Sequence, residues 1–167
     1  MPSIWKNYPI SSAMSDTIDC HTAGLGVIGI GGGVLGPGAD LPAITGSWVV
    51  MTVAPADQAG HNMDKQTARK ICMAVCTGAG AFIGGSKIAA TAAGWIGALF
   101  TGGASLIASA AGNAALNAAF TRSYGRSCAR YFAQIEEIHD TDMLVRILIT
   151  LIGSEMGIDM GESEFVY

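Results

Sequence analysis

Three glycines have the spacing of a dinucleotide-binding loop, Gly24-x-Gly26-x-x-Gly29. Such a loop needs a buried strand before it, a helix after it, and an acidic residue about 20 positions further on. The preceding residues, "SDTIDCHTA", do not form a buried strand, and the nearest downstream acid, Asp40, comes too early. The stretch "GGSK" at 84–87 also lacks the G-K-[ST] order of a phosphate loop. We therefore interpret these glycines as positions of close helix packing.

Cysteine and histidine side chains are the next candidates for chemistry. Cys72 and Cys76 are four residues apart, so they share one face of a helix, and Cys20-His21, His61 and Cys128 are possible additions to a metal site. A zinc site typically shows two close ligand pairs. Only one loose pair is present, which favours buried structural thiols, and helical geometry disfavours a Cys72–Cys76 disulfide. No nucleophile–base–acid set is evident either, so we expect no enzyme activity, no catalytic or metal-binding residues and no cofactor.

Three arginines, Arg122, Arg126 and Arg130, recur at spacing four directly after a long uncharged run. This arrangement suits guanidinium groups that meet phosphates at a membrane surface or pair with protein acids. A solvated helix face is the alternative. The acids that the sequence offers most readily are Glu136, Glu137, Asp140 and Asp142.

Small residues also recur at spacing four, which allows helix backbones to approach closely. Asn113 and Asn117 share a face of the same apolar region, where amides tend to bond across an interface and fix its register. The positions expected to pack helices together are Gly80, Gly84, Gly97, Gly112, Asn113 and Asn117.

The composition indicates a chain that hides most of its surface. Half of the residues are hydrophobic, 23 are glycine, and only 13% are charged, about half of the usual share of ~25%. The mean hydropathy is +0.42. These values favour a membrane-associated protein or a homo-oligomer, and a net charge of −4 gives no reason to expect nucleic-acid binding. The N-terminal segment lacks the apolar core of a secretory signal, so we expect a cytoplasmic chain with reduced thiols.

The elements that must position these residues are expected to be helices. We expect an irregular segment at 1–16, a Gly/Ala-rich apolar helical domain at 17–139, and an amphipathic helix with an acidic tail at 140–167. The pattern of 17–36 favours neither strand nor helix. A helix is predicted from an Asp40 cap, with Pro42 in its first turn, to about residue 54, where Pro55 ends or kinks it.

Two further helical regions follow. A helix is predicted to start near Asn62 or Asp64 and to break at 84–85. The residues 88–121 carry no charge, and "TGG" at 101–103 divides them into a helical hairpin. The last helical region is expected from about 118 to Gly157, interrupted at "HDTD".

The C-terminal helix has an apolar stripe with a period near 3.6. Because this helix is short, one-sided and poor in basic residues, we expect its stripe to dock on a protein partner, with aromatic side chains of the acidic tail as further anchors. The expected partner-binding residues are Leu144, Ile147, Leu148, Leu151, Phe165 and Tyr167.

The order of these features resembles a known family, the bacterial YcjF-like domain of unknown function. The resemblance covers about residues 24–133, through "GPGADLPAI", "HNMDKQTARKI", a Gly/Ala-rich hairpin and "NAAFTRSYGRSCARYF". In the last piece, the matching residues are Thr121, Gly125, Arg126, Tyr131 and Phe132. The sequence departs from the pattern at Gly-Pro-Gly, 36–38, and at Pro55, and it contains no GTPase domain, to which the family is often fused. The resemblance implies a helical, membrane-associated, non-enzymatic domain without known catalytic residues.

Together these observations predict an all-α protein of Gly/Ala-packed hairpins that forms a homo-oligomer. The expected function is a scaffold or anchor that positions partner proteins at a membrane. One alternative is a subunit of a larger redox complex that encloses an apolar chamber for a lipid or quinone. Another is a pore-forming or membrane-perturbing protein, since the uncharged hairpin could insert.

Overall fold

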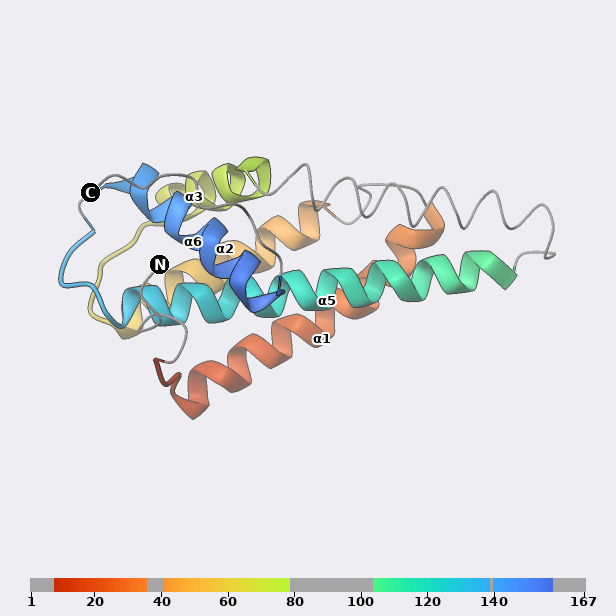
Figure 1. The fold of residues 1–167 in the computed structure, drawn as a ribbon, viewed down its shortest axis with the longest axis horizontal. Coiled ribbons are helices and arrows are strands. Elements are labelled where there is room, and N and C mark those ends of the chain that lie inside the picture. The colour runs from red at the N-terminus through yellow and green to blue at the C-terminus, as the bar shows by residue number, and fades with distance from the viewer. Residues whose placement is uncertain (1–7, 36–40, 79–103, 139, 158–167) are drawn as a thin grey trace.

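The computed structural model describes residues 8–35, 41–78, 104–138 and 140–157. Every regular element in these residues is a helix, which confirms the all-α prediction (Figure 1). The helices are α1 (Ser12–Leu35), α2 (Leu41–Gln58), α3 (Lys65–Gly78), α5 (Ala104–Phe132) and α6 (Thr141–Glu155).

Short polar residues set several helix ends. Asp64 precedes α3, and its Oδ1 accepts the backbone N–H groups of Gln66 and Thr67 at 2.8 and 3.0 Å. Asp140 caps α6 in the same way, accepting the N–H of Asp142 at 2.8 Å. These side chains satisfy amides that have no partner within the helix. Gly157 follows α6 with a φ of +68°, a conformation that glycine adopts without strain.

Three helices extend beyond their predicted bounds. Helix α1 begins at Ser12, so the last residues of the segment expected to be irregular are helical. Helix α2 continues through Pro55 to Gln58, because a proline in the last turn forfeits only one backbone hydrogen bond. Helix α5 runs without a break from Ala104 to Phe132, where a new region had been expected near 118. A break before α6 is present, but among the described residues it covers 133–138 and 140, so it begins before "HDTD", and the last two residues of that stretch already belong to α6.

Helices α1 and α5 lie antiparallel and make the most extensive helix pair in the molecule (Figure 1). At one end of this pair, the side chain of Ile18 lies against Gly125. At the other end, Gly29 lies against Ala114. We call one section of the pair the arm, namely residues 22–30 of α1 and 107–119 of α5. The rest of the described molecule is the base.

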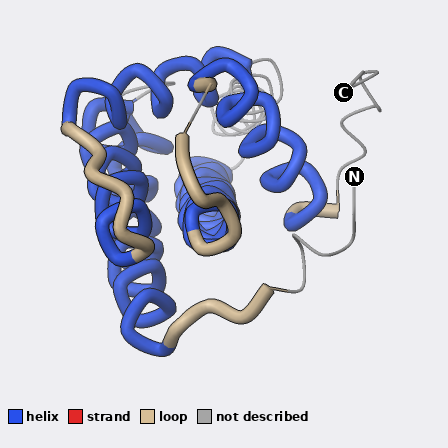
Figure 2. Tube along the Cα trace, turned by 90° about the vertical axis from the view of Figure 1, so that its left-hand side faces the viewer, coloured by secondary structure: helices blue, strands red, loops and turns tan. Residues whose placement is uncertain are grey.

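The base contains most of the hydrophobic core, to which Leu25 of the arm also belongs. Viewed along the long axis, α5 is seen end-on with the other helices around it (Figure 2). Trp48 of α2 stacks on Tyr124 of α5, with ring centroids 4.2 Å apart and planes 9° from parallel. Large apolar side chains of α3 and α6 complete the core, among them Ile71, Val75, Leu144 and Leu148. Burying each such side chain stabilises a fold by roughly 1.5–3 kcal/mol.

Candidate functional site

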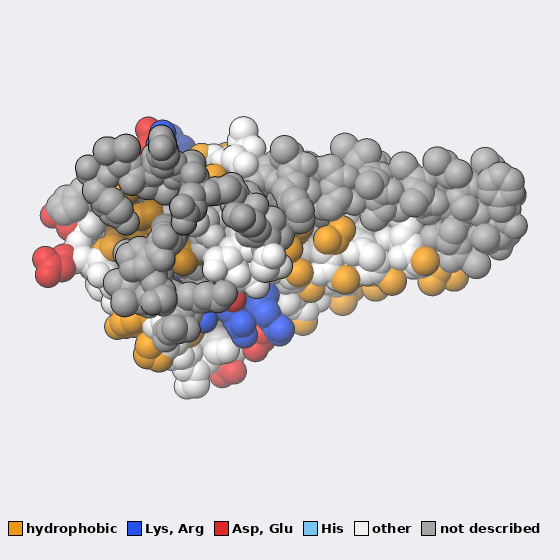
Figure 3. All heavy atoms as spheres, viewed as in Figure 1, with side chains coloured by type: hydrophobic (Ala, Val, Ile, Leu, Met, Phe, Trp, Pro, Cys, Tyr) orange, Lys and Arg blue, Asp and Glu red, His pale blue; other side chains and the backbone are white. Residues whose placement is uncertain are grey.

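The outer face of the arm is apolar throughout. Val27 and Ile107 are 69% and 75% exposed, and Ile28 and Ile30 are also exposed. The remaining exposed positions of the arm are small residues: Ala23, Gly24, Ala108, Ala111, Ala115 and Ala119. In Figure 3, hydrophobic side chains line the lower edge of the projecting part of the molecule. No polar side chain of the arm, among these described residues, is exposed.

The polar side chains of the arm lie inside it. Thr22 of α1 and Ser109, Asn113 and Asn117 of α5 are all buried. Asn113, only 3% exposed, donates a hydrogen bond of 2.7 Å from Nδ2 to the backbone oxygen of Gly29. This bond crosses from α5 to α1, so the amide links the two helices at one register. The arm therefore buries its polar side chains, beside Leu25 and Ala110, and exposes only apolar ones.

Gly29 allows the two helices of the arm to approach closely. A Cβ at this position would lie 2.7 Å from both the Ala114 Cα and the Asn117 Nδ2. Gly112, in contrast, has nothing within 4 Å of such a Cβ among the described residues, so it does not help to pack α5 on α1. Its spacing was right for a small-residue stripe, but that side of α5 does not face α1. The other predicted packing glycines, Gly80, Gly84 and Gly97, lie outside the described residues.

Charged side chains mark where the arm meets the base. Asp19 of α1 and Arg122 of α5 form an ion pair of 2.9 Å, with each side chain half exposed. Beyond this pair, α1 carries no charge from Thr22 to its end, and α5 carries none back to Ala104. In Figure 3, the hydrophobic edge gives way here to charged side chains.

The other two arginines of α5 meet one acid of α6. Arg130 pairs closely with Glu155, and the Arg126 Nη1 lies 3.9 Å from the Glu155 Oε2. Burial, and secondly the neighbouring Arg126 charge, lower the pKa of Arg130. Asp19 and Glu155 were not among the acids that the sequence suggested, because they are distant in sequence and become neighbours only in the fold. All three arginines therefore have carboxylate partners within the chain.

The apolar stripe of α6 faces the core of its own chain. Leu144, Leu148 and Leu151 are buried, and Ile147 is partly buried against the core cluster. The periodicity correctly indicated a buried face, but the helices that cover it are α3 and α5, so these four residues do not form a surface for a partner. Phe165 and Tyr167 lie outside the described residues.

A buried polar cluster joins three helices in the base. Thr52 of α2 lies 2.6 Å from the Tyr124 hydroxyl and 3.4 Å from the Cys72 Sγ, and the Cys72 Sγ lies 3.2 Å from that hydroxyl. Cys128 is fully buried nearby. Burial is the main cause that raises the pKa values of Cys72, Tyr124 and Cys128. The contacts of this cluster connect α2, α3 and α5, and its burial disfavours the thiolate, the form in which cysteine acts as a nucleophile or metal ligand.

The remaining cysteines and histidines are dispersed. All four cysteines are free thiols; Cys20 is exposed and Cys76 is partly buried. Within the described part of the chain, no three residues of the types His, Cys, Asp and Glu come together as a metal site. The His61 Nε2 lies 3.1 Å from the Phe132 backbone oxygen, which ties the α2–α3 loop to the end of α5. His139 is outside the described residues.

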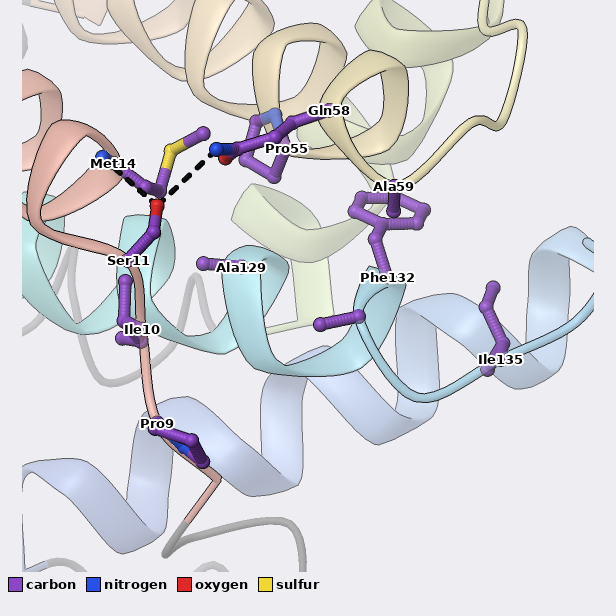
Figure 4. A pocket seen from close by; sticks show the side chains of 11 residues that line it. Pro9, Ile10, Ser11, Met14, Pro55, Gln58, Ala59, Ala129, Phe132 and Ile135 are labelled. Atoms are coloured by element: carbon purple, nitrogen blue, oxygen red, sulfur yellow. Dashed lines mark hydrogen bonds between the residues drawn. The ribbon is translucent and has the colours of Figure 1, made fainter.

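A cavity of about 300 Å³ opens at the end of the base, between the first turn of α1 and the last turns of α2 and α5 (Figure 4). Apolar side chains dominate its wall. Ser11 is one of its few polar groups, and its Oγ already accepts the Met14 N–H and the Gln58 amide. The serine therefore caps α1, and its two hydrogen-bond partners among the described residues are amides, which do not act as general bases.

The apolar face of the arm is the site that sequence analysis missed. Val27, Ile28, Ile30 and Ile107 were not singled out, although a signal for them exists. Ser109, Asn113 and Asn117 recur at spacing four, so the polar side chains of this uncharged run occupy one face of a helix and leave Ile107 off it.

No helix of the described residues is both long enough and hydrophobic enough to cross a bilayer. In comparisons with protein-family models, curated proteins and solved structures, none matches this chain. The resemblance to the YcjF-like domain therefore stays a prediction.

Proposed function

We propose that this protein is a non-enzymatic membrane anchor, in which the arm enters the apolar phase of a lipid bilayer and the base remains in water to position a partner protein. The observation that carries this proposal is the inverted polarity of the arm. Its amides and hydroxyls are buried between α1 and α5, and its large exposed side chains are aliphatic.

The two possible surroundings of the arm, water and lipid, favour opposite arrangements. In water, burying an amide is unfavourable unless it is hydrogen-bonded, and exposing Val27, Ile30 and Ile107 forgoes the main driving force of folding. In lipid, helices gain nothing by hiding aliphatic side chains from one another. They associate through small residues and polar side chains instead, as Gly29 and Asn113 do here.

The extent of the uncharged region fits the same proposal. From Ala104 to Thr121, α5 rises about 27 Å at 1.5 Å per residue. This is shorter than the roughly 30 Å of hydrocarbon in a bilayer, so the arm would enter the apolar phase without crossing it. The Asp19–Arg122 pair then lies at the level where the polar interface of the membrane begins. Arginines that are paired within the chain do not require anionic lipid, so the contact is expected to be apolar and insensitive to salt.

Flotation with neutral phosphatidylcholine vesicles tests the proposal. The double variant Ile30→Asn with Ile107→Asn places two amides on the outer face of the arm. Its matched control, Val50→Asn with Met143→Asn, places the same amides at exposed apolar positions of the base. We expect the wild type and the control to float at both low and high salt, and the arm variant to lose most of its flotation.

The same wild-type and variant proteins distinguish lipid from other binding partners that could cover the arm. If a second copy of the chain covers the arm, light scattering without lipid should show an oligomer that the arm variant alone dissociates, and vesicles should not compete with it. Flotation that disappears at high salt, or that Arg122→Gln with Arg126→Gln and Arg130→Gln abolishes, would assign binding to the arginines and contradict an apolar contact.

A further inference from the structure

A groove of about 740 Å³ lies between α2 and α3, which pack side by side in the base (Figure 1). It is separate from the arm, and its lining combines two cations with apolar and small residues. The residues that line it are Pro42, Thr45, Gly46, Val49, Lys65, Gln66, Arg69 and Met73.

The cations of this groove differ from the arginines of α5. Lys65 and Arg69 are exposed, and no ion pair among the described residues includes either of them. Both stand on one side of α3, one turn apart. In a chain whose net charge is −4, two unneutralised cations beside a groove form a local site for a negatively charged ligand.

The floor of the groove is apolar. Val49 is partly buried, and Met73 is 50% exposed on the opposite side. Methionine is flexible and polarisable, so it suits contact with apolar side chains of different shapes. The ligand that this groove fits is therefore an amphipathic one, with negative charge at the rim and an apolar group on the floor.

The start of α3 argues for a carboxylate ligand over a phosphate. Phosphates typically bind the free N–H groups at a helix N-terminus. At α3 those of Gln66 and Thr67 are already accepted by the Asp64 carboxylate. The groups that remain for binding an anion are the Lys65 and Arg69 side chains. Two carboxylates one turn apart on a partner helix have a spacing that matches these two cations.

We propose that this groove binds an acidic amphipathic segment of a partner protein, whose carboxylates pair with Lys65 and Arg69 while an apolar side chain rests on Val49 and Met73. The inference rests on the proposed function, because it names the surface by which the base would hold a partner at the membrane. It is nevertheless tested without lipid, so its failure and that of the membrane proposal are distinguishable.

The test uses a fluorescently labelled helical peptide with two glutamates one turn apart and leucines on the adjacent face. Its binding to the full chain is measured by fluorescence anisotropy. Lys65→Gln with Arg69→Gln should weaken binding about tenfold, the effect of two exposed charge pairs. The matched control, Lys70→Gln with Arg146→Gln, removes the same charge from exposed positions outside the groove and should change affinity less than about twofold.

A second pair of variants tests the apolar floor. Met73→Ser should weaken binding several-fold, whereas Met143→Ser, at a position 51% exposed on α6, should not. A peptide with glutamines in place of the glutamates should bind as weakly as the charge variant does. Equal losses in the groove and control variants, or no binding of the acidic peptide by the wild type, would overturn the proposal. The proposal would also be overturned if the groove bound inorganic phosphate or anionic vesicles but did not bind the peptide.

Discussion

The two halves of α5 differ in the large side chains that they bury. In the arm, its buried face carries Ser109, Asn113 and Asn117, and its most exposed large residue is Ile107. In the base, the buried face carries aromatic side chains beside three hydroxyl residues, Thr121, Ser123 and Ser127, and the exposed face carries charge. The aromatic residues are Phe120, Tyr124, Tyr131 and Phe132. The change occurs within a few residues, next to the Asp19–Arg122 pair.

This difference is what the proposed function would require of one helix that serves two surroundings. The base follows the usual rule of water-soluble proteins, in which the core is apolar and charge faces outward. The arm is held by close helix approach at Gly29 and by a cross-helix amide, in addition to the burial of Leu25. The two regions should therefore respond differently to substitution, and the predictions below compare them in order of decreasing effect.

Truncating the aromatic centre of the base should have the largest effect. Trp48→Ala removes a buried indole that stacks on Tyr124 and donates from Nε1 to the Thr121 hydroxyl at 3.2 Å. We expect a loss of about 3–5 kcal/mol in the free energy of unfolding, measured by chemical denaturation. Val50→Ala, two residues along at an exposed position, should cost less than about 0.5 kcal/mol. Similar losses at both positions would mean that the base lacks an aromatic core.

A methyl group at Gly29 should separate the helices of the arm. Gly29→Ala places a Cβ 2.7 Å from the Ala114 Cα, a backbone atom that cannot move without displacing α5. We expect a destabilisation of about 1–3 kcal/mol, because overpacking forces the backbones apart. Gly112→Ala meets open space and should stabilise the protein by about 0.5–1 kcal/mol through helix propensity.

Both glycine variants are compared with the wild type by thermal and denaturant unfolding, in solution and in the presence of neutral vesicles. If Gly29→Ala does not destabilise the protein, the close packing of α1 on α5 is contradicted. If Gly112→Ala destabilises the protein, Gly112 has the helix-packing role that the sequence suggested.

Alkaline pH should weaken the base through its buried cluster. Unfolding lets Cys128 and Tyr124 ionise near their ordinary pKa values of 9.0 and 10.0, whereas the fold raises both pKa values and keeps the groups protonated. Their contribution is thus complete below about pH 9 and declines above it, by up to about 1.4 kcal/mol per pH unit for each group.

Unfolding free energies between pH 7 and 10.5 measure this decline. Cys128→Ala should make the decline shallower, while Cys20→Ala, at an exposed position of α1, should leave it unchanged. An identical alkaline decline in the Cys128 variant would show that this thiol does not stay protonated in the fold.

The smallest effect is expected at the cap of α3. The Thr67 hydroxyl, followed by its backbone N–H, lowers the pKa of Asp64 from its ordinary value of 3.8. The stabilisation is therefore present above that value and is lost as the pH falls through the lower folded pKa. Asp64→Asn keeps an acceptor oxygen but does not titrate, so the melting temperature should fall less between pH 5 and about 2.5. Asp57→Asn, exposed at the end of α2, serves as the control.

Local signals in the sequence predicted much of the fold. Asp64 and Gly157 were identified as end signals because capping depends on neighbouring residues, and the uncharged run was correctly interpreted as helical from 104 onward. The helical nature of α1 was missed, since its glycines weaken local propensity. Contacts with α5 stabilise this helix, and such contacts are not visible in a local pattern.

The candidate site was predictable only in part. Asn113 was expected to bond across a helix interface, and it does so to Gly29. The stripe of α6 shows the limit of periodicity: the pattern indicates that Leu144 and Leu148 are covered, but it does not indicate by which helix. The partners of the arginines, Asp19 and Glu155, depend on the same missing information.

The most direct test of the central claim is the depth of the arm in a bilayer. A spin label is attached at Ile107→Cys, or at Val50→Cys as the control in the base, after Cys20→Ala and Cys76→Ala remove the accessible thiols. Power-saturation EPR with neutral vesicles then compares collisions with oxygen, which concentrates in lipid, and with a water-soluble nickel chelate. We expect oxygen to dominate at position 107 and nickel at position 50. Equal, water-like accessibility at both positions would contradict insertion of the arm.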